Sequence, residues 1–412
     1  MADDQKIFGM PANTGRWIFV LLGMVVNFCL GAVYAYSVFK KPLEEMFKIS
    51  ATQGGLPYMI FLAMFALFTF LAGKFIDRLG PRKVMMFGGA IVGVGWMLTY
   101  FASNITMVIL TYGIIGGAGV GIVYGGPVSV ATRWFPDKKG LAVGLALAGF
   151  GGSAIATAPI ASALIGQYGP LGAFGIMGIA FFFITIILAI PMKFPPAGYK
   201  PAGWKPPAAA AGGVANFAPG QMIKTSSFYG LWLCYILGAT AGLMAIGISA
   251  SVGREVIGLD KTMAASLVML FAVFNGIGRP IFGALTDKIT PKYSAILSFV
   301  LIFIASAMML SASNGSVVLY AVAFCLFWLC LGGWLAIGPA ATAGFFGLDG
   351  YAQKYGVVFS SYGLGAIIGG IISGSAKDAF GSYTVAFYPT AGMAIAGIII
   401  ALLLLKPPKP KK

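Results

Sequence analysis

Twelve apolar stretches of about 20 residues each recur along this chain of 412 residues and constrain its fold more than any other feature. An α-helix needs about this length to cross the hydrocarbon core of a bilayer. In chain order the stretches cover residues 17–39, 53–73, 84–102, 107–132, 140–164, 172–192, 228–250, 263–286, 294–313, 316–343, 355–374 and 385–405. Only 9% of the residues are charged, against about a quarter in a soluble domain. The sequence therefore predicts an all-α integral membrane protein with twelve transmembrane helices.

The stretches form two sets of six, separated by residues 193–227, which are rich in Pro, Gly and Ala. This composition is typical of an irregular linker. A motif at residues 73–83, after the second stretch, recurs at 283–292, after the eighth. We therefore expect two pseudo-symmetric six-helix bundles, 1–192 and 228–412, the second ending in a basic cytoplasmic tail. Parallel six-helix repeats are a feature of secondary transporters, whose substrate site lies between the halves.

The balance of charge predicts the orientation in the membrane. There are 27 Lys and Arg residues against 11 Asp and Glu, a formal net charge of +16. With the N-terminus placed inside, 20 of the 27 basic residues fall in the inner segments and 6 in the outer ones. Because cytoplasmic segments carry an excess of Lys and Arg, we expect a multi-pass protein of the plasma (bacterial inner) membrane with both termini in the cytoplasm. The charge thus reflects topology, and we expect no nucleic-acid partner.

The chain contains no histidine, which excludes His-dependent acid–base catalysis, Ser–His triads and His-liganded metal sites. Its four cysteines, Cys29, Cys234, Cys325 and Cys330, lie in apolar stretches, and we expect them to be small buried side chains. The stretches also lack the facing aspartates of an intramembrane protease. The sequence therefore predicts that the protein is no enzyme and holds no metal or cofactor.

One basic residue, Arg279, lies within an apolar stretch, roughly 12 Å from the inner surface at 1.5 Å of rise per residue. A cation at this depth marks a substrate pathway or an internal partner. Since all 11 carboxylates lie outside the stretches or at their ends, the expected counter-ion is an anionic substrate. The guanidinium fork matches a carboxylate; snorkelling or a supporting role is the alternative. Asn275, at i−4, can bond a hydroxyl or keto oxygen of the substrate, or a neighbouring helix.

The motif at 73–83 resembles the loop 2–3 signature of the major facilitator superfamily, and its second copy strengthens the resemblance. Residues 31–37, 119–125, 133–140 and 275–280 are similar to its branch of oxalate/formate antiporters and monocarboxylate transporters. The resemblance covers essentially the whole chain. It implies the major facilitator fold and a rocker-switch carrier for small carboxylates, with Arg279 as the ligand of the substrate carboxylate.

Positions where this sequence differs from the branch narrow the range of expected substrates. Oxalate-type members carry a second cation in helix eleven where this chain has Tyr362, which favours a monoanion of the lactate or pyruvate type. Vertebrate monocarboxylate carriers have a lysine late in helix one, where residues 17–39 of this chain contain none, and an Asp where this chain has Asn275. The resemblance therefore does not carry their proton relay over to these positions. The resemblance implies these further substrate-binding residues, each of which could instead be core packing: Tyr34, Tyr124, Leu145, Phe150, Leu331, Leu335, Phe359 and Tyr362, with Asn27 as a weaker candidate.

The repeated motif itself implies a gate. Asp77, Arg78 and Asp287 lie among basic residues, near the expected starts of the helices that follow. The resemblance implies that they latch the cytoplasmic side in one conformation, with plain loop stabilisation as the alternative.

The predicted function is secondary transport of a small monocarboxylate by alternating access, with proton symport. The proton would bind a group near the helix ends, such as Glu255, or travel with the substrate. The alternatives are an oxalate/formate-type antiporter, uniport or exchange, and a substrate sensor, which the short linker does not favour. The expected partners are the monocarboxylate anion, H⁺ and the lipid bilayer, and the expected functional unit is a monomer.

Overall fold

The computed structural model describes residues 6–196, 199–201, 217–347 and 351–408, and of Asp77, Lys139, Gly140 and Ala352 the backbone alone. The described residues are helical apart from irregular connections and one hairpin of two short strands, β1 (Lys6–Ile7) and β2 (Met10–Pro11). The helices of the first half are α1 (Ala12–Leu30), η1 (Gly31–Ala35), α2 (Tyr36–Phe47), α3 (Ala51–Leu79), α4 (Pro81–Thr99), α5 (Ile105–Val108), η2 (Ile109–Gly116), α6 (Gly117–Trp134), α7 (Lys139–Gly152) and α8 (Ala154–Ala189). Those that follow are α9 (Pro219–Met222), α10 (Ser226–Glu255), α11 (Lys261–Leu310), α12 (Val317–Phe346), α13 (Tyr351–Phe380), η3 (Tyr383–Ala386) and α14 (Phe387–Leu404).

Nine helical runs among the described residues are long and apolar enough to cross a membrane. Two of them contain a break: Gly169 in α8 has a φ of 71° and Thr290 in α11 a φ of 75°. A proline follows each break, at a position where a ring clash disfavours helical geometry in the preceding residue. Each of these runs is therefore two crossings. With the 19-residue α4, the described residues contain twelve long helical segments, in agreement with the sequence prediction.

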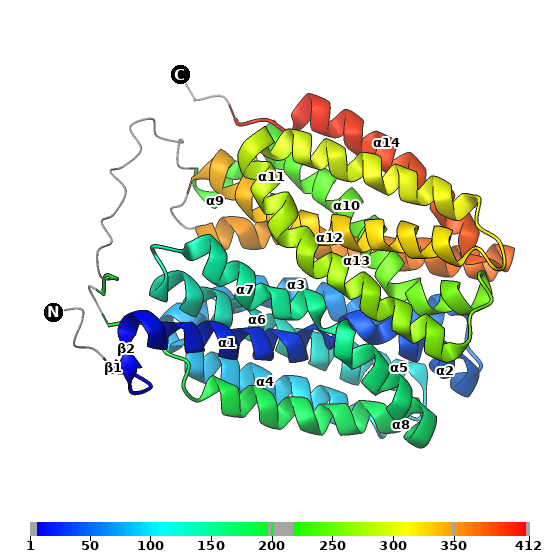
Figure 1. The fold of residues 1–412 in the computed structure, drawn as a ribbon, viewed down its shortest axis with the longest axis horizontal. Helices are drawn as coiled ribbons and strands as arrows, with labels where there is room; N and C mark the ends of the chain where they lie inside the picture. Colours follow the sequence, from blue (N-terminus) through cyan, green and yellow to red (C-terminus); the bar gives the residue numbers. More distant parts are fainter. Residues whose placement is uncertain (1–5, 197–198, 202–216, 348–350, 409–412) are drawn as a thin grey trace.

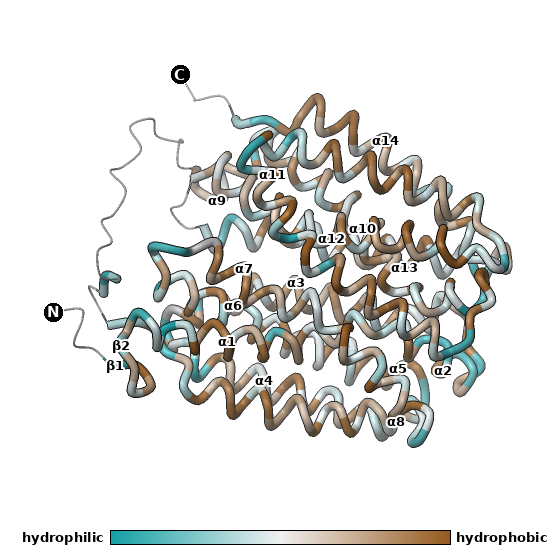
Figure 2. The backbone as a smooth tube through the Cα atoms, viewed as in Figure 1, coloured by the Kyte–Doolittle hydropathy of each residue, from teal (hydrophilic) through white to brown (hydrophobic). Residues whose placement is uncertain are grey.

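The two sets of helices lie side by side. In Figure 1, α1 to α8 occupy the lower part of the bundle and α10 to α14 the upper part. The hairpin and the last turn of α14 lie at one end, here named the terminal end, and α2 and α5 lie at the opposite, distal end. Hydrophobic residues cover the middle of the bundle, while hydrophilic residues gather at its two ends (Figure 2). This distribution fits a hydrocarbon layer around the middle.

The interface between the halves is built by α3 against α13 and by α7 and α8 against α11. Gly363 of α13 faces Ala63 and Ala66 of α3, so small residues let the two backbones approach closely. The four cysteines are buried and free, as predicted.

The predicted linker, residues 193–227, lies between α8 and α10. Part of it, residues 197–198 and 202–216, is outside the described residues. Its described part contains the short helix α9, and the backbone N–H of Phe217 donates to the carbonyl of Phe346. The division into domains at 192 and 228 stays a prediction.

Candidate functional site

Arg279 lies in α11 at the interface of the halves, and its side chain is buried, with 6% of the residue exposed. Its Nη1 donates to the carbonyl oxygen of Leu147 on α7, at 2.6 Å. Nε and Nη2 are buried and form no hydrogen bond with a described residue. No carboxylate of a described residue forms an ion pair with this guanidinium. A buried cation with two free donors is costly unless an anion binds it, so the site is preorganised for an anion.

Asn275, one turn before Arg279, is fully buried. Its Nδ2 donates to the carbonyl of Trp328 on α12 at 3.1 Å, while its Oδ1 has no partner. The amide nitrogen thus makes the hydrogen bond to a neighbouring helix that the sequence analysis gave as the alternative. The amide oxygen makes no hydrogen bond with a described residue. Gly151 of α7 faces both residues: a Cβ there would lie 2.9 Å from Asn275 Oδ1 and 3.3 Å from Arg279 Nε. The absence of a side chain at Gly151 therefore shapes the space beside Arg279.

Tyr34 and Tyr362 join the halves directly. Their hydroxyl oxygens are 2.7 Å apart, and both side chains are fully buried. Tyr34 lies in η1, where the chain tightens between α1 and α2, and its ring meets Phe150 and Trp328 edge-on at 5.2 and 6.2 Å. The charge of Arg279 also acts on the hydroxyl of Tyr34. Two sequence-predicted residues from opposite halves are therefore brought together beside the buried cation.

Tyr124 of α6 and Phe359 of α13 stack across the same interface, with ring centroids 6.4 Å apart. Phe65 of α3 was missed by the sequence analysis, yet it lies at the centre of this aromatic cluster. Its ring contacts Tyr124, Phe150, Phe359 and Tyr362 at 5.0 to 5.8 Å. A phenylalanine in an apolar stretch carries no signal that separates this position from ordinary core packing.

The remaining predicted residues are less closely associated with Arg279. Leu331 is fully buried and packs against Gly242 of α10, and Leu335 is 8% exposed. Asn27 donates to the carbonyl of Ala146 at 2.9 Å, a bond within the first half. Leu145 is 40% exposed, so it is outside the buried cluster that contains Phe150. Its role as a wall of the site stays a prediction.

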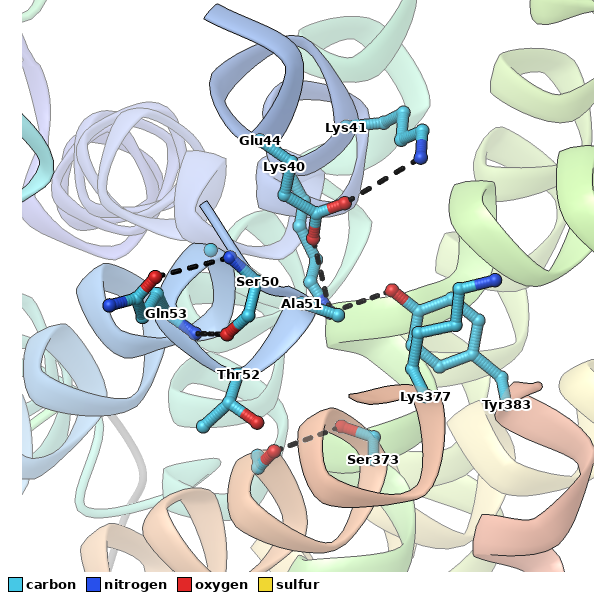
Figure 3. Close-up of polar contacts among 12 residues, drawn as sticks. Lys40, Lys41, Glu44, Ser50, Ala51, Thr52, Gln53, Ser373, Lys377 and Tyr383 are labelled. Atoms are coloured by element: carbon cyan, nitrogen blue, oxygen red, sulfur yellow. Dashed lines mark hydrogen bonds and ion pairs between the residues drawn. The ribbon is translucent and has the colours of Figure 1, made fainter. Parts of the chain in front are cut away.

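A second polar cluster closes the distal end of the interface. Figure 3 shows Lys40 of α2 reaching toward Tyr383 of η3, beside Lys377 of α13, with Glu44 between Lys40 and Lys41. Lys40, which is 2% exposed, donates to the Tyr383 hydroxyl at 3.1 Å. Both lysines lie within 4.0 Å of Glu44. Lys40, Lys41 and Lys377 are three of the six basic residues that the sequence analysis counted in outer segments, without a further role.

Glu255, the last residue of α10, connects both halves at this end. Its carboxylate lies 3.4 Å from Lys41 and 2.6 Å from Lys377. Beside it, Asp378 of α13 accepts hydrogen bonds from the backbone N–H groups of Ala51 and Thr52 at 2.8 and 3.0 Å, where it caps the start of α3. Carboxylates at a helix N-terminus are favourable because the first N–H groups lack partners. Ion pairs and a cap therefore hold the two halves together at the distal end.

The predicted gating residues lie at the opposite, terminal end. Asp77 and Arg78 are within the last turn of α3, and Asp287 is within α11 before its break at Thr290. They therefore lie at the ends of the preceding helices, close to the starts of α4 and of the part of α11 that follows Thr290. Arg78 and Asp287 are exposed and form no ion pair with a described residue, and the side chain of Asp77 lies outside the described part. Their gating role stays a prediction.

Within the first half, the terminal end is held by Arg16, which is 4% exposed. Its guanidinium makes a bidentate pair with Asp137 at 2.6 and 2.7 Å and donates to the carbonyl of Trp134. The hydrogen bonds and charge of Arg16 hold the pKa of Asp137 below its usual range, against the opposing effect of burial. This pair fixes the start of α1 against the connection between α6 and α7.

The described residues form twelve helical segments in two halves, and bury between them a cation that pairs with no described carboxylate; this arrangement defines a multi-pass membrane protein of the transporter class. A family model of the Major Facilitator Superfamily matches residues 17–328 and, separately, 231–412. The chain belongs to the Major Facilitator Superfamily.

Two relatives align along nearly the whole chain. The chain is 27% identical over 392 residues to the oxalate:formate antiporter of Oxalobacter formigenes, an alignment that covers 95% of this chain and 91% of that protein. It is 24% identical over 406 residues to monocarboxylate transporter 13 of Rattus norvegicus, covering 96% and 90%. The protein is thus a transporter related to both groups, as the sequence motifs indicated.

The fold has a counterpart among solved structures. It is similar to the crystal structure of a bacterial homolog of the human lysosomal transporter Spinster in an inward-facing, unoccupied conformation. The TM-score is 0.68, with 17% sequence identity and 95% of each chain covered. At this identity the likeness concerns the fold.

Proposed function

We propose that the protein is a proton-coupled symporter of small monocarboxylates of the lactate and pyruvate type, with Arg279 binding the substrate carboxylate. The observation that carries this proposal is the buried Arg279 guanidinium, whose Nε and Nη2 have no partner. Nε and an Nη form the edge that a carboxylate can bind with two parallel hydrogen bonds. The free Oδ1 of Asn275 lies on the same helix face, where it can accept from the hydroxyl of a 2-hydroxy acid.

A monoanion fits this site better than a dianion. The aromatic cluster around Arg279 is apolar and buried, with Tyr362 bonded to another hydroxyl. A second carboxylate would lose its hydration there without meeting a second cation, which is unfavourable. The relatives include both an oxalate:formate antiporter and monocarboxylate transporters, so carboxylate exchange is the second candidate.

The contacts between the halves at the distal end support alternating access. With the N- and C-termini in the cytoplasm, as the distribution of Lys and Arg favours, the distal cluster around Glu255 is an external gate. In the conformation described here this external gate is closed. Opening requires Lys41 to part from Glu255 and the α3 N-terminus to part from Asp378. The transporter works as a monomer, because each chain contains both halves of the site.

Uptake of radiolabelled L-lactate into proteoliposomes tests the proposal. We expect uptake to rise with an inward proton gradient and to fall at least a hundredfold in Arg279→Ala, because hydrogen bonds to charged groups contribute about 1.5–3 kcal/mol each. Lys224→Ala, which removes an exposed cation, is the matched control and keeps full uptake. Equal uptake with and without the gradient would exclude symport. Competition by oxalate as strong as that by lactate would instead favour the antiporter.

A further inference from the structure

A cavity of about 290 Å³ opens at the terminal end, away from the interface between the halves. Its walls come from three parts of the first half: the hairpin residues Ile7 and Phe8, Arg82 in the first turn of α4, and residues 190–193 after α8. The hairpin is fixed in place because Gly15 of α1 leaves room for the backbone of Ile7. The cavity is thus framed by ordered elements.

The charged residues that line this cavity are basic. Arg82 and Lys193 line it, both exposed, and no acidic residue is among the described residues that line it. Neither cation forms an ion pair with a described carboxylate. Lys6 and Lys83 adjoin the lining residues in sequence. Two unpaired cations in a hollow create a positive potential that favours an anionic ligand.

The apolar part of the cavity continues toward the middle of the bundle. Ile190 is 43% exposed, and Ile187, one turn earlier on α8, is 58% exposed. Phe87, one turn after Lys83 on α4, is 64% exposed. A cationic mouth therefore lies directly beside an apolar surface of the kind that faces acyl chains.

The hairpin presents an aromatic ring at this boundary at a cost in backbone energy. Phe8 has a φ of 53°, in the left-handed region that bulky residues rarely adopt. With Gly9, at 77°, it forms a two-residue hairpin loop. Its ring contacts Phe19 at 5.2 Å and is still 46% exposed. Strain of this kind persists where the surroundings hold it, and aromatic rings favour the membrane–water interface.

We propose that this cavity binds an anionic phospholipid from the membrane leaflet at the terminal end. The phosphodiester contacts Arg82 and Lys193, and an acyl chain lies along Ile190 and Ile187. Basic pockets beside transmembrane helices suit such headgroups. A free phosphate shares the headgroup chemistry but would leave the adjacent apolar surface unused.

Native mass spectrometry of the purified, detergent-solubilised protein tests this site. Dioleoyl phosphatidylglycerol is titrated against dioleoyl phosphatidylcholine, with glycerol 3-phosphate as the arm for a free phosphate. We expect one phosphatidylglycerol molecule to bind tightly to the wild type. The affinity should be about thirtyfold lower in Arg82→Gln/Lys193→Gln, because each cation near the membrane surface raises the affinity for an anionic lipid about fivefold. Lys224→Gln/Lys288→Gln removes two exposed cations at the same end and serves as the charge-matched control.

Each outcome decides the proposal. Equal loss of phosphatidylglycerol from the two double variants, or equal affinity for phosphatidylcholine in the wild type, overturns it. Binding of glycerol 3-phosphate with the same affinity makes the cavity a phosphate site and also overturns it. Arg82→Lys, which keeps the charge, should retain most of the lipid affinity, and this separates a lost contact from a misfolded chain.

Discussion

Arg279 depends on the shape of its guanidinium as well as on its charge. One nitrogen is bonded to the Leu147 carbonyl, and two others are free. A lysine has no planar fork and would have to choose between the carbonyl and the substrate. We therefore predict that Arg279→Lys weakens L-lactate binding about tenfold to a hundredfold, the loss of one charged hydrogen bond. Isothermal titration calorimetry measures the affinity for L-lactate. Wild-type affinity in this variant would contradict the role of Arg279 as the carboxylate ligand.

The Tyr34–Tyr362 bond connects the halves in this conformation. Tyr362→Phe leaves the buried Tyr34 hydroxyl without a partner, which costs about 1–3 kcal/mol. Tyr34→Phe/Tyr362→Phe removes both hydroxyls and should be less destabilising than the sum of the single changes. Thermal unfolding of the wild type and the three variants gives the double-mutant cycle. Strict additivity would mean that the two hydroxyls do not interact in the membrane protein.

For single residues, the sequence analysis succeeded where a polar or charged residue lies within an apolar stretch. Arg279 and Asn275 stand out in an apolar stretch, and the structure buries both at the interface. Phe65 could not be recognised, because its ring differs in no way from the other apolar residues of α3. Leu145 was included from the resemblance alone, and its 40% exposure depends on how α7 is rotated, which one sequence does not show.

Close approach of α7 and α11 depends on Gly151. A Cβ there would lie 2.9 Å from Asn275 Oδ1 and 3.2 Å from the Cα of Gly276. We predict that Gly151→Ala lowers stability by about 1–3 kcal/mol through overpacking and also weakens lactate binding. Gly144→Ala on the same helix is the control, since no heavy atom lies within 4 Å of its Cβ position. The control should keep its lactate affinity and gain stability, because alanine has a higher helix propensity than glycine. Equal melting temperatures for the two variants would contradict the prediction.

The Arg16–Asp137 pair gives the first half a pH-dependent element. The pKa of Asp137 is lowered in the folded protein, so its contribution to stability is fully present above its usual range and is lost as the pH falls through the lowered value. We predict that Asp137→Asn melts at a lower temperature at pH 7 and that its difference from the wild type shrinks by pH 3. Melting curves across this range test it. Glu45→Gln, at an exposed residue without a described ion pair, should show no such convergence.

Across the whole molecule, periodicity and length predicted the twelve segments because a bilayer imposes them on any helix that crosses it. The gap between the two sets of six and the repeated motif predicted the two halves. The distal cluster escaped prediction because Lys41, Glu255 and Lys377 lie on three helices far apart in sequence. Only the packing of α2, α10 and α13 brings them together.

The distal cluster should set the balance between the two conformations of the carrier. Glu255→Gln removes the charge that holds Lys41 and Lys377, and partly buried ion pairs of this kind contribute about 1 kcal/mol. We predict that the ratio of distal-open to distal-closed molecules rises about fivefold. Spin labels at Phe101→Cys and Val318→Cys, which are 70% and 76% exposed at the distal end, report the opening by pulsed EPR. The native cysteines are buried and should not react.

A second pair of labels separates rocking from local fraying. If the halves move as rigid bodies about Arg279, opening at the distal end must bring exposed positions at the terminal end closer, such as Lys83→Cys and Lys288→Cys. Glu255→Gln should therefore lengthen the distal distances and shorten the terminal ones in the same fraction of molecules, whereas Glu45→Gln changes neither. Longer distal distances with unchanged terminal ones would mean that α2 frays alone, and the cluster would then stabilise one helix end without controlling access to the site.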